Sequence, residues 1–187
     1  MNNLYDVFII GGGINGCGVA RDAAGRGYSV YLAEKNDIAS GTSSASSKLI
    51  HGGLRYLENY EFSFVRASLR ERDILIKIAP HIIKEMRFIL PYHKNLRPVW
   101  ILKMGMLLYD NLYSSKHIKR SSYIKIPFHE SKSTLTESFN KGFEYSDCIT
   151  DDARLTVLNA ADAKRLGGDI NTRTIVKNME QKKGVWN

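Results

Sequence analysis

Three glycines near the N-terminus are spaced as in a turn that binds dinucleotides. Gly11, Gly13 and Gly16 form the pattern Gly-x-Gly-x-x-Gly. In such a turn the first glycine permits a tight bend, the second lets a pyrophosphate approach the backbone, and the third allows close helix–sheet packing. The free N–H groups that begin the next helix then offer partial positive charge to the phosphates. The alternative is a glycine-rich turn in some other α/β domain.

A carboxylate follows the turn near the spacing expected for a ribose-binding acid. Glu34 ends the apolar run at residues 29–33, where it can accept hydrogen bonds from ribose hydroxyls. A negative charge there repels a 2′-phosphate, so the sequence disfavours NADP.

The apolar pattern predicts the strands and the helix that hold these groups in place. Residues 7–10 are apolar and precede the turn, which predicts a strand buried on both faces. A helical pattern begins near Ile14 and closes at Gly25 and Gly27, and a second strand is expected at residues 29–33. This order is typical of the start of an α/β fold with a parallel sheet.

Residues 35–58 contain further groups that could bind a ligand. The small, polar segment 35–47 lies just beyond a strand end, where α/β sheets bind ligands, so we favour a binding loop over a flexible linker. Arg55 could hold a phosphate by a bidentate contact. His51 and Tyr56 could instead be ordinary packed side chains.

The remaining pattern predicts helices at 60–79, 99–113 and 153–165, and strands at 86–92, 144–149 and 170–176. Asp151 or Asp152 is expected to cap the last helix. The segment between Lys116 and Lys141 is interpreted as a loop. The helix at 99–113 is rich in Trp, Leu and Met, and we favour a core position over a membrane or partner face, although basic residues follow it.

Composition limits the classes of function. The chain has 187 residues, enough for one domain or slightly more, and a formal net charge of +8. That charge suits an anionic membrane, anionic small ligands or a solvated basic surface, whereas the scattered basic residues form no nucleic-acid motif. Cys17 and Cys148 form no metal-binding pattern and suit a reducing compartment. We expect no metal, signal peptide or membrane span.

Two longer stretches resemble a known family. GGGINGCGVARDAAGRG at 11–27 and TSSASSKLIHGGLRYLE at 42–58 are similar to the FAD-dependent glycerol-3-phosphate dehydrogenases, as is GFEYSDCITDDARL at 142–155. The resemblance covers nearly the whole chain. It implies a Rossmann-like FAD-binding domain, with a ββα start to a parallel sheet, and part of an α+β substrate domain. We place the first part of the FAD-binding domain at 1–60 and the partial substrate or cap region at 61–187.

The resemblance also implies site residues. Arg55 and Tyr56 match positions at the substrate phosphate. The positions that match FAD contacts are Gly11, Gly12, Gly13, Ile14, Asn15, Gly16, Glu34, Thr42, Ser43, Ser44, Ser47, Leu49, Ile50 and His51.

Family members oxidise sn-glycerol 3-phosphate to dihydroxyacetone phosphate and pass electrons to quinone, so the resemblance implies these partners. It also implies a cytoplasmic protein, or a peripheral one on an anionic cytoplasmic membrane face. The family is longer than this chain, and the catalytic residues are expected beyond residue 187. The sequence is therefore interpreted as an N-terminal portion that leaves apolar faces exposed, and a second chain could supply the rest. The alternatives are an inactive remnant that binds adenine dinucleotides weakly, and a non-enzymatic basic module at a membrane.

Overall fold

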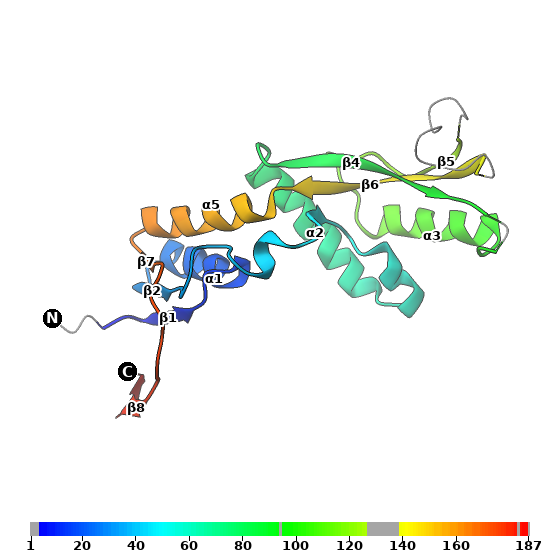
Figure 1. The fold of residues 1–187 in the computed structure, drawn as a ribbon. Helices are drawn as coiled ribbons and strands as arrows, with labels where there is room; N and C mark the ends of the chain where they lie inside the picture. Colours follow the sequence, from blue (N-terminus) through cyan, green and yellow to red (C-terminus); the bar gives the residue numbers. More distant parts are fainter. Residues whose placement is uncertain (1–3, 94, 127–138, 183, 187) are drawn as a thin grey trace. The chain divides into compact units, whose positions relative to one another are not determined.

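The computed structural model of the protein describes residues 4–93, 95–126, 139–182 and 184–186 (Figure 1). The chain forms two units, one made of residues 1–48 and 151–187 and the other of residues 49–150. We call them unit 1 and unit 2. This division differs from the predicted one at residue 60, because the chain returns to the first sheet after residue 150.

Unit 1 contains a parallel three-stranded sheet in the order β1-β2-β7. Its strands are β1 (Val7–Ile10), β2 (Val30–Ala33) and β7 (Asp169–Asn171). Helices α1 (Ile14–Gly25) and α5 (Asp152–Arg165) precede β2 and β7 in the chain. The predicted α/β class and parallel sheet are confirmed. β7 is shorter than the strand expected at 170–176.

The core of unit 1 lies on one face of the sheet, where small residues let the two helices pack closely. Its fully or nearly buried members are Cys17, Ala20, Ala24, Val30, Leu32, Ala160 and Ala163. On the other face Phe8 and Ile10 are 51% and 54% exposed. The prediction that the first strand is buried on both faces is therefore wrong, because α1 and α5 cover only one of them. The expected exposed apolar face is present.

Unit 2 is built around the long strand β6 (Lys141–Thr150), which pairs antiparallel with β3 (Leu49–Ile50), β4 (Ile83–Pro91) and β5 (Ser122–Lys125). Its helices are α2 (Phe62–Ile78) and α3 (Val99–Leu112), and a 3-10 turn, η2, spans Leu54–Asn59.

Two predictions for unit 2, the loop after residue 116 and the core position of the helix at 99–113, are only partly correct. β5 lies in the segment that we interpreted as a loop, and residues 127–138 of that segment lie outside the described residues. The core position predicted for α3 is correct for Met106 and Tyr109. It is wrong for Trp100, Met104 and Leu107, which are 61–63% exposed.

Two short strands, β8 (Gln181–Lys182) and β9 (Val185–Trp186), pair antiparallel near the end of unit 1. In the part of the chain that the structure describes, no helix combines the length and the apolar character needed to cross a membrane.

Candidate functional site

The glycine turn of unit 1 has the strained and crowded geometry that requires glycine. Gly11 has a φ of +108°, in the region that side chains disfavour, and its N–H donates to the carbonyl oxygen of Ala33 over 2.8 Å. A Cβ at Gly16 would lie 2.0 Å from the carbonyl oxygen of Gly11. The turn is thus fixed to the end of β2, and α1 starts directly against it.

The N-terminus of α1 is available to an anion. Its N-cap, Gly13, has no side chain, and no acidic residue lies in the first turn. The N–H groups of Asn15 and Gly16 have no acceptor within the helix, because the first turn of any α-helix lacks one. The N–H of Ile14 donates to the Ser43 hydroxyl over 2.8 Å. The helix therefore keeps its partial positive charge beside a hydroxyl group that could also contact a phosphate.

Glu34 has a structural task that the sequence did not reveal. It is only 9% exposed. Its Oε2 accepts a hydrogen bond from the Gly12 N–H and its Oε1 accepts one from the Asn36 N–H, both over 2.7 Å. These backbone donors, Gly12 first, hold the pKa of the carboxyl below its usual value. The charged carboxylate thus ties the turn to the end of β2, and each oxygen retains acceptor capacity for a ribose hydroxyl.

Neither cysteine is a candidate nucleophile. Cys17, in α1, has its Sγ 3.5 Å from the Gly12 carbonyl oxygen, and Cys148 lies in β6. Both are fully buried. Burial, with the charge of Glu34 as a lesser cause, raises the pKa of the Cys17 thiol to about 11.

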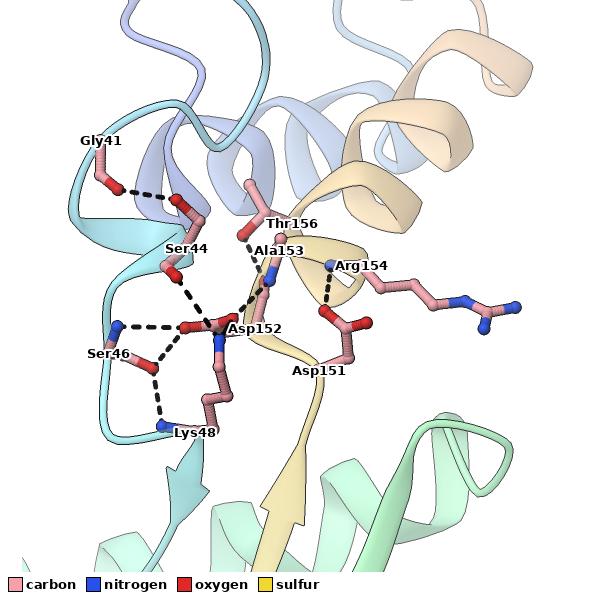
Figure 2. A network of polar contacts seen from close by, with 9 residues as sticks. All are labelled: Gly41, Ser44, Ser46, Lys48, Asp151, Asp152, Ala153, Arg154 and Thr156. Carbon is pink, nitrogen blue, oxygen red and sulfur yellow. Dashed lines mark hydrogen bonds and ion pairs between the residues drawn. The ribbon is translucent and has the colours of Figure 1, made fainter.

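The polar segment after Glu34 is tied at several points. Thr42–Ser44 form a 3-10 turn, η1, and the Ser44 hydroxyl donates to the Gly41 carbonyl over 3.1 Å. Figure 2 shows that this segment also contacts Asp152 at the start of α5. These contacts argue against the flexible-linker alternative. Thr42, Ser44 and Ser47 are exposed hydroxyl-bearing residues, and the Ser44 oxygen can still accept a hydrogen bond from a ligand.

The candidates of unit 2 lie around β3 and η2. Leu49 and Ile50 pair with β6, whereas His51, Arg55 and Tyr56 are exposed. The packed-core alternative is therefore wrong for His51. The Tyr56 ring packs edge to face against that of Phe64, so the packing alternative stays open for Tyr56. No ion pair links Arg55 to another described residue, so its guanidinium is available to an anion.

The structure thus brings together, in unit 1, the glycine turn, Glu34 and the hydroxyls of residues 42–44. The candidates Leu49, Ile50, His51, Arg55 and Tyr56 belong to unit 2. Among the described residues, no group of three or more His, Cys, Asp or Glu side chains could hold a metal ion.

The chain is similar to several known proteins. A sequence model of the family described as FAD dependent oxidoreductase matches residues 6–187. A glycerol-3-phosphate dehydrogenase of Pseudomonas tolaasii is 54% identical over 183 residues, which are 98% of this chain and 35% of the relative. A D-erythritol 1-phosphate dehydrogenase of Brucella abortus is 52% identical over 181 residues, which are 97% of this chain and 36% of the relative.

Among solved structures, that of the glycerol-3-phosphate dehydrogenase from Bacillus halodurans complexed with FAD is similar, with a TM-score of 0.67 and 29% identity. The match covers 99% of this chain and 29% of that chain. The chain spans about a third of the length of the curated relatives it matches.

Proposed function

Because this chain belongs to the family of FAD-dependent oxidoreductases, we propose that it serves the FAD-dependent oxidation of sn-glycerol 3-phosphate to dihydroxyacetone phosphate, with electrons passed to a quinone. The observation that carries this proposal is the 54% identity to a glycerol-3-phosphate dehydrogenase over 98% of the chain. FAD is the cofactor of the family.

The residues of unit 1 suit the adenine side of FAD. The N–H groups of Asn15 and Gly16 would bind the pyrophosphate, and Gly13 leaves it room at the backbone. The carboxylate of Glu34 would accept hydrogen bonds from the ribose hydroxyls. When bound, FAD supplies a ring system that accepts a hydride. The chain's own contribution is to fix the cofactor by its phosphates and ribose.

The substrate class is a polyol phosphate. The two relatives of nearly equal identity act, by name, on glycerol 3-phosphate and on D-erythritol 1-phosphate. Both compounds carry a phosphate dianion and neighbouring hydroxyls, and the exposed guanidinium of Arg55 suits the phosphate. We favour glycerol 3-phosphate because several other curated relatives carry that substrate in their names.

The test is an assay with FAD, a quinone analogue and each of the two phosphates in turn. It is run with the chain alone and with a second polypeptide that supplies the remaining part of the Pseudomonas tolaasii relative. We expect reduction of the quinone analogue with glycerol 3-phosphate in at least one of these mixtures. Flavin binding without turnover in any mixture would instead support an inactive protein that only binds the dinucleotide.

A second candidate function is docking at the cytoplasmic face of an anionic membrane. Trp100, Met104 and Leu107 follow one another at helical spacing on α3 and are 61–63% exposed. Exposed Lys103 and Lys119 and the net charge of +8 would add attraction to anionic lipids. Flotation with vesicles tests this: binding to anionic but not neutral vesicles is expected, and replacing Trp100 and Leu107 by Ser should abolish it. Equal flotation of the two proteins would reject this surface.

A further inference from the structure

The carboxylate of Asp152 accepts most of its hydrogen bonds from residues 46–48 and only one from its own helix (Figure 2). Oδ2 accepts hydrogen bonds from the N–H and the hydroxyl of Ser46, over 3.1 and 2.7 Å. Oδ1 accepts from the Lys48 Nζ over 2.5 Å and from the Ala153 N–H over 2.9 Å. Four donors use the acceptor capacity of the carboxylate, and three of them come from residues that precede it by more than 100 positions.

Lys48 completes this arrangement. Its Nζ also lies 3.4 Å from the Ser44 carbonyl oxygen, and its N–H donates to the Ser46 hydroxyl over 3.0 Å. Its φ of +59° is in the left-handed region, which non-glycine residues adopt only when their surroundings require it. At Lys48 these surroundings include Asp152 and Ser44, which the side-chain ammonium group contacts.

The start of α5 does not need Asp152 as a cap. The side chain of Asp151 already accepts a hydrogen bond from the Arg154 N–H over 3.0 Å. The Lys48 hydrogen bond, followed by that of Ser46, holds the pKa of the Asp152 carboxyl well below its usual range, so these donors favour the charged carboxylate.

The helix that carries Asp152 is itself fixed to the cofactor side of unit 1. Ala160 and Ala163 of α5 pack in one buried cluster with Cys17 and Ala20 of α1. The N–H of Ile14, at the start of α1, donates to the Ser43 hydroxyl. The polar segment is thus held between the N-terminal ends of two helices that are packed on each other.

We propose that Asp152 is a positioning residue that, through Lys48 and Ser46, holds residues 44–48 in the conformation in which the segment contacts FAD. This inference rests on the proposed binding of FAD and assigns a residue that no sequence signal marked as part of the site. Asp152 acts through the segment and does not itself contact the cofactor.

The test measures FAD affinity of the full chain by fluorescence titration, together with amide hydrogen exchange at Ser46. In Asp152→Asn the new side-chain N–H₂ group faces the hydrogen-bond donors of Ser46 and Lys48, so it cannot accept from all of them. We therefore expect FAD to bind at least about tenfold more weakly and the Ser46 amide hydrogen to exchange faster. The matched control is Asp151→Asn, which keeps a good N-cap and should leave both measurements unchanged.

Two variants of the half-exposed Lys48 keep the test valid if Asp152→Asn folds poorly. Lys48→Met should weaken FAD binding in the same direction, whereas Lys48→Arg, which keeps a charged donor, should restore it. Wild-type affinity in Asp152→Asn and Lys48→Met would overturn the inference while leaving the proposed function intact. Failure of the wild-type chain to bind FAD would reject the proposed function, and this role with it.

Discussion

Substitution of Gly16 by Ala should disrupt the candidate site from within α1. A Cβ at this position would lie 2.0 Å from the Gly11 carbonyl oxygen, whereas real Cβ contacts are no shorter than 3.0 Å, so the two must separate by about 1 Å. The turn cannot easily change its conformation, because the Gly11 N–H is hydrogen-bonded to the Ala33 carbonyl oxygen and Gly11 has a φ of +108°. The helix must therefore move, and its packing against α5 suffers.

The magnitude follows from two opposing terms. Overpacking of this kind costs about 3 kcal/mol. The better helix propensity of Ala returns about 1 kcal/mol. The net loss of about 2 kcal/mol corresponds to a melting temperature lower by about 4–8 °C for a chain of this length. We also expect FAD to bind at least about tenfold more weakly, because the N–H groups that would hold its phosphates move with the helix.

Gly18→Ala is the matched control in the same helix. A Cβ there would meet nothing within 4 Å, so only the propensity term remains and stability should rise by up to about 1 kcal/mol. Thermal unfolding followed by circular dichroism and a fluorescence titration with FAD measure both effects. If Gly16→Ala is as stable as Gly18→Ala and binds FAD equally well, the close approach of helix and turn is not required.

The other predictions concern buried groups. Burial raises the pKa of Cys17 and Cys148 to about 11, so only about one thiol in a thousand is ionised at pH 8. A thiol reagent should therefore label neither cysteine until the protein unfolds. Rapid labelling of the native protein would contradict this prediction. Asp147→Ala should lower the free energy of unfolding by about 3–5 kcal/mol, because it leaves the buried Arg72 guanidinium without its ion-pair partner; urea unfolding measures this, and a loss below about 1 kcal/mol would refute it. Folding lowers the pKa of the Glu34 carboxyl, so the charged carboxylate stabilises the fold above its usual pKa of 4.5, and this stabilisation is lost as the pH falls through the pKa in the folded protein. The difference in free energy of unfolding between the wild type and Glu34→Gln should therefore shrink below about pH 4.5. A difference that stays constant with pH would argue against these hydrogen bonds.

Sequence reasoning succeeded where the signal is local. Strand β1, the glycine turn and helix α1 were predicted almost residue for residue, because apolar periodicity and glycine spacing act over a few positions. The family was likewise identified from contiguous motifs and is confirmed by the match over residues 6–187. The sequence predicted either Asp151 or Asp152 as the N-cap residue of α5, and the structure shows that it is Asp151.

The main features that the sequence did not predict depend on contacts between residues far apart in the chain. Asp152 contacts residues more than 100 positions away, and no spacing rule connects them. The exposed face of β1 depends on which helices cover it, and the return of residues 151–187 to the first sheet depends on pairing between β2 and β7. Glu34 was identified as an acceptor, but its backbone partner Gly12 is revealed only by the bend of the turn.

In the proposed complex the N-terminus of α1 holds the pyrophosphate of FAD while Glu34 faces its ribose. An amide NMR titration of the chain with FAD tests this most directly. We predict saturable shifts at Asn15 and Gly16, competition by ADP, and no competition by a dinucleotide that carries a 2′-phosphate. Saturable binding that leaves the resonances of these two amides unshifted, or no binding at all, would contradict this mode of FAD binding.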